Sequence, residues 1–156
     1  MDRFQELGPD GKPCKACVSA EDLIKQGMKI FQKNKDKEKK EVRKDCPVDK
    51  DELGRSTWNL LHTISVYYPN NPTEKNKTDV KNTIESLAQI YPCSHCAEDF
   101  RNDIKEHPIR LENRNELANW MCEVHNRVNE KIGKEKFDCS KVFERWYDGW
   151  KDGSCT

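Results

Sequence analysis

Two cysteines separated by two residues, Cys93 and Cys96, are the part of this sequence best suited to chemistry. Pro92 ends the preceding segment, and the residues after the pair have the composition of a new helix. The pair is therefore expected in a first helical turn, where the positive helix end favours thiolate over thiol. Because the two sulfurs can also reach each other and close a disulfide, this spacing indicates redox chemistry or half of a metal site.

A second pair with the same spacing, Cys14 and Cys17, lies far upstream, beyond a charged segment. A zinc ribbon needs its two pairs roughly 15–20 residues apart, so zinc is the weaker interpretation and no metal is predicted. A thioredoxin-like protein also uses this spacing, but it needs a βαβ context that the sequence lacks. A dithiol without a strand scaffold needs another electron acceptor, and flavin is the planar cofactor that accepts electrons from thiols.

The other four of the eight cysteines suggest cross-links. Cys122 and Cys139 are predicted to form a structural disulfide that pins a helix to a later segment, with two free buried thiols as the alternative. Cys46 and Cys155 bracket the folded part, and they are either two unpaired thiols or one staple within the chain. His95, between the active cysteines, is predicted to be an exposed spacer.

The composition argues against a nucleic-acid-binding protein and against a membrane-spanning one. The chain has 156 residues, 36% of them charged, with 28 basic and 28 acidic side chains. Because proteins that bind polyanions are usually basic, nucleic acid is not an expected partner. No apolar run approaches the roughly 18 residues that span a bilayer, and no secretory signal follows Met1. Disulfides without such a signal lead us to expect an oxidising compartment reached by another route.

Apolar residues at helical spacing predict the elements that must position these cysteines. Four helices are expected, the second capped by Thr73 and the fourth ended by Gly133, followed by a short fifth helix. Their apolar stripes span residues 53–68, 80–90, 97–104, 117–132 and 142–146. No stretch alternates long enough to be a strand, so the predicted fold class is all-α, a four-helix bundle plus a short fifth helix.

Residues 1–45 are predicted to be a flexible N-terminal arm, and residues 46–156 the folded domain. Within the arm, residues 20–31 have the pattern of a short amphipathic helix. Residues 33–44 mix lysine with acidic residues around one valine, which is typical of a solvated linker. A C-x-x-C carried on such an arm can move relative to the folded domain.

Two of the expected helices carry a polar face beside their apolar stripe. On the first helix, the stripe predicted to face the core is Leu53, Leu60, Ile64 and Tyr67. The adjacent face of that helix carries Arg55, Trp58, His62 and Ser65. On the fourth helix, about 120° from its stripe, lie Cys122, His125, Asn126 and Asn129. With Trp146 available to stack, these faces would suit a planar heterocycle; the alternative is an ordinary polar surface with a half-buried Trp58.

The same residues, in order, resemble the FAD-linked sulfhydryl oxidases, most of all the branch of augmenter of liver regeneration and its mitochondrial orthologues. The resemblance covers residues 45–155 and rests on ordered motifs rather than on one pattern. These motifs are Cys46-Pro47, Leu53-Gly54-Arg55, Trp58, Leu61-His62-Thr63, Tyr67-Tyr68-Pro69, Tyr91-Pro92-Cys93 with Cys96-Ala97, Trp120-Met121-Cys122 with His125-Asn126 and Asn129, Phe137-Asp138-Cys139, Arg145-Trp146 and Gly149-Trp150.

The resemblance implies bound FAD and a head-to-tail homodimer in the mitochondrial intermembrane space, with cytosolic or secreted forms as further options. It implies that Cys96 lies against the flavin, that Cys93 exchanges with incoming dithiols, and that Cys14 and Cys17 act as a shuttle. Cys122–Cys139 would be the structural disulfide, and Cys46 would pair with Cys155 of the other subunit. The implied FAD contacts are Arg55, Trp58, His62, Tyr67, Cys122, His125, Asn126, Asn129, Lys131, Arg145 and Trp146.

The expected activity is therefore that of a thiol oxidase that forms disulfides in protein dithiols. The import oxidoreductase of the intermembrane space is the implied dithiol donor, and oxygen or cytochrome c the implied acceptor. The competing hypothesis is a non-catalytic partner module, such as a growth-factor-like ligand that uses the same fold as a stapled scaffold. Flavin absorbance of the purified protein separates the two.

Overall fold

The computed structural model describes residues 45–155. Two compact units share this range, and each is described by itself: residues 45–55 with 92–94, and residues 56–91 with 95–155. The expected shuttle pair, Cys14 and Cys17, and the helix expected over residues 20–31 lie outside the described residues.

Helices make up the regular structure of residues 45–155, and no strand occurs among them. The elements are α2 (Lys50–Tyr67), α3 (Glu74–Ile90), α4 (Ser94–Glu106), α5 (Arg114–Lys131), the 3₁₀-helix η2 (Cys139–Lys141) and the π-helix η3 (Glu144–Asp148). The predicted all-α fold, with four helices followed by a short helical segment, is confirmed. None of the described helices is long and apolar enough to cross a membrane.

Capping residues explain where the helices begin and end. Thr73 accepts a hydrogen bond from the backbone N–H of Asn76 at 3.1 Å, and Asn76 returns the contact to the Thr73 N–H at 2.9 Å. This capping box confirms the predicted start of α3. Asn113 caps α5 through a single bond, in which its side chain accepts from the Glu116 N–H at 3.0 Å. Beyond α5, Gly133 has a φ of 73°, a left-handed conformation that glycine adopts without strain.

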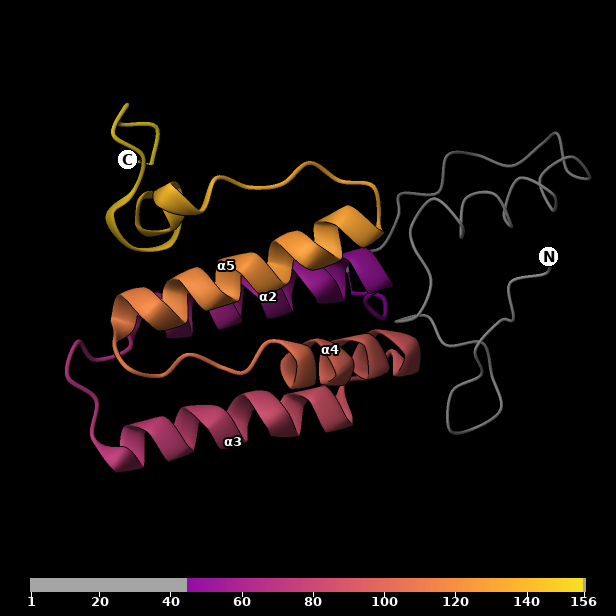
Figure 1. Ribbon diagram of the computed structural model, residues 1–156. Coiled ribbons are helices and arrows are strands. Elements are labelled where there is room, and N and C mark those ends of the chain that lie inside the picture. The colour runs from indigo at the N-terminus through magenta and orange to yellow at the C-terminus, as the bar shows by residue number, and fades with distance from the viewer. Residues whose placement is uncertain (1–44, 156) are drawn as a thin grey trace, which may run out of the picture. The chain divides into compact units, whose positions relative to one another are not determined.

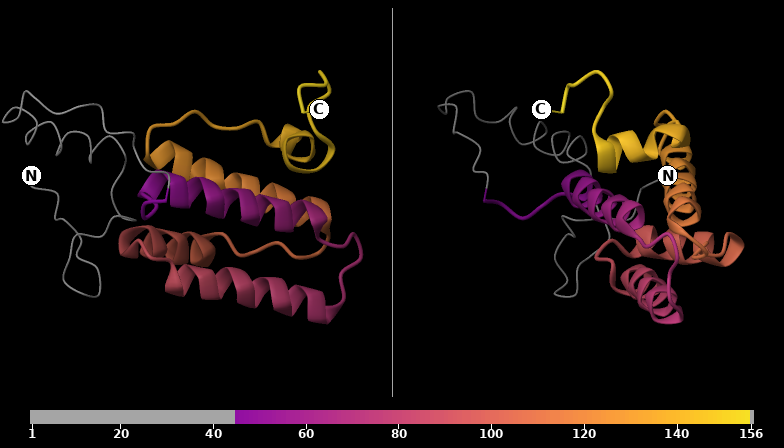
Figure 2. Two further views of the ribbon diagram at one scale, coloured as in Figure 1. Left: turned by 180° about the vertical axis from the view of Figure 1, so that it is seen from behind. Right: turned by 90° about the vertical axis from the view of Figure 1, so that its left-hand side faces the viewer.

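In the unit of residues 56–91 and 95–155, the helices run alongside one another and the C-terminal segment folds back beside α5 (Figures 1 and 2). Their main core joins α2, α3 and α5, with partly buried side chains of α4 packed against it. The buried members are Leu61, Tyr68, Ile84, Leu117, Trp120, Met121 and Val124. Trp120 is only 1% exposed, and its Nε1–H donates to the His107 carbonyl at 2.9 Å, so the largest core side chain is also satisfied in hydrogen bonding.

The prediction that Leu60 and Tyr67 face the core is wrong, since they are 60% and 62% exposed. The buried face of α2 instead carries Leu61, His62, Ser65 and Val66. The apolar stripe does not mark the inward face of this helix. The side chains that face α5 and the C-terminal segment include an imidazole and a hydroxyl, and Ser65 is satisfied by donating to the His62 carbonyl at 2.7 Å.

In the other unit, Asp49 caps the start of α2. Its carboxylate accepts from the Glu52 N–H at 2.8 Å, and its carbonyl accepts from the Leu53 N–H at 2.9 Å. These contacts pair two of the backbone donors that every helix start leaves open. Cys46, a few residues earlier, is exposed.

Candidate cofactor and redox site

Four aromatic rings from three elements meet at one place, and we call them the ring cluster: Trp58, His62, His125 and Trp146. Trp58 stacks on His125 with centroids 4.1 Å apart and 6° between the planes. His62 stacks on Trp146 at 3.8 Å and 12°. The sequence predicted that these faces of α2 and α5 and the segment of Trp146 would come together, and the geometry has them in direct contact.

A second small core holds Trp146 against the helices. Its buried members are Val66, Ala118, Cys122 and Val142, and Phe137, Cys139, Phe143 and Trp146 pack against them. Phe137 meets Trp146 edge to face, with centroids 5.4 Å apart. The supporting role of Phe137 was not predicted, because a single aromatic residue in a loop carries no periodic signal.

The segment that leads to Trp146 is fastened to α5 at two successive points. Cys122 and Cys139 form a disulfide, with an S–S distance of 2.03 Å. One turn along α5, the Asn126 side chain accepts from the Phe137 N–H at 2.7 Å and donates to the Phe137 carbonyl at 2.8 Å. The Asn126 side chain therefore pairs both backbone polar groups of Phe137, and both its oxygen and its nitrogen are hydrogen-bonded within the protein.

Burial keeps both imidazoles of the ring cluster neutral. It lowers the pKa of His62 from 6.5 to about 3, helped by the nearby His125 and the positive charge of Arg145. It also lowers the pKa of His125 to about 4, helped by the positive charge of Lys134. A hydrogen bond of 2.9 Å joins His62 Nε2 to His125 Nδ1, so one of the two nitrogens donates and the other accepts.

Within residues 45–155, two buried polar atoms of the ring cluster have no hydrogen-bond partner, the Nδ1 of His62 and the Nε1 of Trp146. An unsatisfied buried group costs about 1–3 kcal/mol, so native proteins seldom leave one without a reason. The carbonyl oxygens and ring nitrogens on the edge of a flavin would satisfy such atoms. The Arg145 guanidinium lies 4.9 Å from the Trp146 ring and adds positive charge for an anionic cofactor. These residues fit FAD.

Other expected FAD contacts are not among the four rings and have different partners or surroundings. Tyr67 is exposed and packs on Tyr147, with centroids 4.8 Å apart. Lys131 forms an exposed ion pair with Asp99 at 3.2 Å. Arg55 is exposed and falls in the other unit. Spacing along a helix could not distinguish these side chains from the four rings that meet.

A hollow of about 80 Å³ lies between α2, α3 and α5, apart from the ring cluster. Its lining is almost wholly apolar and includes Leu61, Ile84 and Met121. Apart from Ser65 and Thr83 the lining residues are apolar, so this hollow offers few groups that could orient a dinucleotide.

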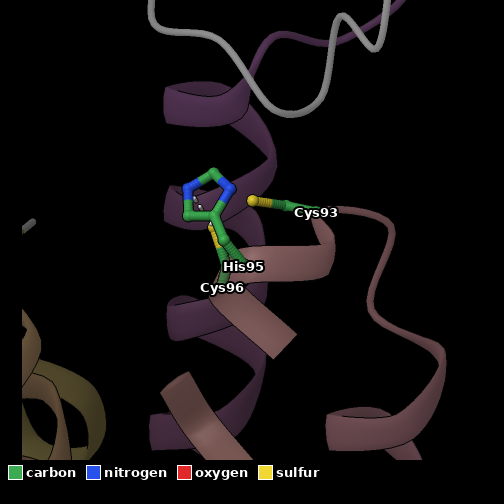
Figure 3. A group of neighbouring side chains, drawn as sticks. All are labelled: Cys93, His95 and Cys96. Carbon is green, nitrogen blue, oxygen red and sulfur yellow. Dashed lines mark hydrogen bonds between the residues drawn. The ribbon is translucent and has the colours of Figure 1, made fainter. Parts of the chain in front are cut away.

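Cys93 immediately precedes α4, and Cys96 lies in its first turn, as predicted. Each of these two sulfurs and a ring nitrogen of His95 lie within 4.8 Å of one another (Figure 3). Both cysteines are disulfide-bonded, so neither sulfur is a thiolate in this state; among residues 45–155, no disulfide joins the two to each other. Cys93 is buried, Cys96 is half-buried, and His95 is exposed.

The last two cysteines, Cys46 and Cys155, are exposed and free. The staple within one chain, one of the two options left open by the sequence, is therefore not formed. The Cys155 sulfur accepts from the Trp150 N–H at 3.3 Å, which fixes it in the turn that follows η3.

Comparisons with known proteins point to one family. Residues 55–147 match the model of the Erv1/Alr family. The chain is 39% identical to the mitochondrial FAD-linked sulfhydryl oxidase ERV1 of Saccharomyces cerevisiae, over 92% of this chain and 87% of that protein. It is 42% identical to the FAD-linked sulfhydryl oxidase ERV1 of Arabidopsis thaliana, over 64% of this chain and 52% of that protein.

Solved structures give the same answer for the fold. The yeast Erv1 core superposes with a TM-score of 0.68 and 43% identity, over 76% of this chain and all of that one. The FAD-binding domain of Erv1 from S. cerevisiae superposes with a TM-score of 0.65 and 46% identity, over 67% of this chain and all of that one.

Proposed function

This chain belongs to the Erv1/Alr family and is a FAD-linked thiol oxidase, and we propose that it forms disulfides in protein dithiols of the mitochondrial intermembrane space. The observation that carries the proposal is the Cys93–Cys96 pair at the start of α4, in a chain similar over 92% of its length to a mitochondrial sulfhydryl oxidase. We further propose that electrons leave for oxygen or cytochrome c, and that an import oxidoreductase supplies the dithiols.

We assign the flavin to the ring cluster, where Trp58, His62, His125 and Trp146 offer planar faces and two unpartnered polar atoms. Bound FAD accepts two electrons, which a pair of thiols can supply. The neutral imidazoles present hydrogen-bonding edges without a charge that would have to be desolvated. The resemblance adds as further contacts Arg55, Tyr67, Cys122, Asn126, Asn129, Lys131 and Arg145.

Within the redox pair, we propose that a substrate thiolate attacks the Cys93 sulfur and releases Cys96 as a thiolate. The second substrate thiol then displaces Cys93, so the substrate leaves as a disulfide and the pair is left reduced. Cys96 lies in the first turn of α4, where the helix end stabilises the thiolate that passes electrons on. Because Cys93 is buried in this structure, the attack requires a local opening.

Single substitutions distinguish the two roles. With Cys96→Ser, a substrate variant that keeps only one of its two cysteines, supplied as a mixed disulfide with a small thiol, should be trapped on Cys93. The small thiol leaves, and neither partner then has a second thiol beside the new bond to resolve it. Cys93→Ser should give little trapping at Cys96. Mass spectrometry of cysteine-containing peptides identifies the site, and preferential trapping at Cys96 would show that the roles are reversed.

Oxidase activity is tested by dithiothreitol-dependent oxygen consumption of the purified, yellow protein. We expect Cys93→Ser and Cys96→Ser to abolish turnover and to retain FAD. Cys155→Ser is the matched control, because it also removes a cysteine sulfur but lies outside the redox pair. Full turnover in either redox-pair variant would remove the assignment.

We also propose two functional regions, a flexible arm over residues 1–45 and the oxidase domain over residues 46–156. Cys14 and Cys17 on the arm would relay electrons from a large protein substrate to Cys93–Cys96. Deleting residues 1–40 should then spare oxidation of dithiothreitol and cripple oxidation of a protein dithiol. If the truncated protein oxidises both substrates as fast as the full chain does, the arm is only a linker.

Finally, we propose a homodimer in which Cys46 of one chain bonds Cys155 of the other. Both thiols are free and exposed, and the exposed apolar side chains of Leu60 and Tyr67 are consistent with a surface that is covered by a second chain. Non-reducing electrophoresis should show a disulfide-linked dimer that Cys155→Ser converts to a monomer band. A monomer band in the unaltered protein contradicts the intersubunit bond.

A further inference from the structure

His95, which the sequence indicated was only a spacer, contacts the sulfur of its neighbour. Its Nε2 lies 3.5 Å from the Cys96 Sγ, within hydrogen-bond range for sulfur. Figure 3 shows the imidazole beside the cysteine sulfurs at the start of α4. The ring is exposed, as predicted, so its position is not explained by core packing.

The surroundings on α4 favour negative charge on Cys96. The first turn of α4 contains no acidic side chain, and the backbone N–H groups of a helix start attract an anion. The nearby Asp99 carboxylate is paired with Lys131 at 3.2 Å. An imidazole N–H that donates to the sulfur would add to this stabilisation when Cys96 is a thiolate, and it would lose most of its effect when Cys96 is in a disulfide.

We propose that His95 is a positioning residue that holds Cys96 as a thiolate and thereby favours the reduced form of the Cys93–Cys96 couple. This inference rests on the proposed function, in which this couple carries electrons from the substrate to FAD. In the step it affects, the substrate dithiol loses two electrons and becomes a disulfide. The Cys93–Cys96 bond breaks, Cys93 gains a proton, and Cys96 stays a thiolate, so one proton is released.

The expected effect follows from how thiolate stabilisation acts on a couple. If His95 favours the thiolate tenfold, its removal lowers the reduction potential of this two-electron couple by about 30 mV. This full shift is expected at a pH where reduced Cys96 is a thiolate both with and without His95. At a lower pH, where the thiol predominates in both proteins, the thiolate fraction falls tenfold instead. Because a more basic thiolate is also a better nucleophile, the alkylation rate of Cys96 at that lower pH should fall by only about threefold.

Three variants of the full-length, FAD-containing protein test the proposal in buffers that contain a metal chelator. His95→Ala removes the donor, and His95→Gln retains an N–H donor without an imidazole. Ser94→Ala is the matched control, because Ser94 is the other exposed residue between the cysteines. Each protein is equilibrated with dithiothreitol redox buffers and quenched with an alkylating reagent, and the reduced fraction of the Cys93–Cys96 peptide is measured by mass spectrometry.

We expect His95→Ala to need a buffer about tenfold more reducing for half-reduction of the pair. We expect His95→Gln to recover part of the difference and Ser94→Ala to match the unaltered protein. Alkylation of Cys96 in the fully reduced proteins, measured at a lower pH where the thiol predominates, should slow in the same order. Because His95 is exposed, flavin content and far-ultraviolet circular dichroism should not change.

Equal redox midpoints for His95→Ala and the unaltered protein would overturn the inference, as would an equal shift in Ser94→Ala. These outcomes differ from a failure of the proposed function. If Cys93–Cys96 is not the electron-carrying pair, Cys93→Ser or Cys96→Ser still passes electrons from dithiothreitol to the flavin at the unaltered rate. If only the His95 inference is wrong, these two variants lose that transfer, and His95→Ala has the redox midpoint of the unaltered protein.

Discussion

Replacing Asn126 with alanine should loosen the whole segment that carries Trp146. The Asn126 side chain makes two hydrogen bonds to the Phe137 backbone, at 2.7 and 2.8 Å, in a half-buried setting. Each bond contributes about 1 kcal/mol, and a Phe137 group left without a partner costs about 1–3 kcal/mol before water compensates for part of it. We therefore expect a total loss of about 2–4 kcal/mol in the free energy of unfolding.

The assay is urea unfolding of the full chain with Cys122–Cys139 intact. At a typical slope of about 2 kcal/mol per molar urea, the midpoint should fall by about 1–2 M. Asn102→Ala is the control, because Asn102 is an exposed asparagine on α4. If Asn126→Ala unfolds within about 0.5 kcal/mol of the control, the idea that this side chain fastens the segment is refuted.

Three further predictions concern the same region. Replacing both Cys122 and Cys139 with alanine should cost about 3 kcal/mol, since the disulfide closes a loop of 17 residues, and a change below about 1 kcal/mol in urea unfolding would contradict this. Stability should fall as the pH drops from about 6.5 towards 4, because the unfolded chain protonates both imidazoles there while the folded pKa values are about 3 for His62 and 4 for His125. The loss by pH 5.5 should be roughly 2–3 kcal/mol in total, and His125→Gln should flatten the profile; an unchanged profile would refute the burial argument. Trp58→Ala should lower flavin content and melting temperature together, because a ligand held by the folded state stabilises it, and unchanged flavin content would show that Trp58 is not part of the cofactor site.

The four main helices could be predicted because their signals are local. Thr73 begins α3 with a capping box, and Gly133 ends α5 in a left-handed conformation, and both residues have characteristic preferences at helix termini. The exposure of Leu60 could not be predicted, because whether an apolar side chain is covered depends on how the helices pack against one another. The sequence stripe on α2 left Leu60 and Tyr67 indistinguishable from core residues.

Some parts of the candidate site could likewise be predicted from the sequence, and others could not. Trp58, His62 and His125 could be placed on the correct helix faces, because those faces follow from helical periodicity. The stacking of His62 on Trp146 and the fastening of Phe137 by Asn126 depend on a loop that folds back over 11 residues, and no periodic pattern encodes that path. The contact of His95 with Cys96 depends on a side-chain rotamer, which the sequence does not specify.

The central claim is that electrons pass from a dithiol through Cys93–Cys96 to FAD, and anaerobic mixing with dithiothreitol tests it most directly. Loss of flavin absorbance is followed without oxygen and with a small excess of dithiol over protein, because the Cys93–Cys96 disulfide and the flavin each take up two electrons. The account predicts rapid loss of the yellow colour in the unaltered protein and in Cys155→Ser, and retained colour in Cys93→Ser and in Cys96→Ser. Flavin that is reduced at the unaltered rate in either of these two variants would contradict the account.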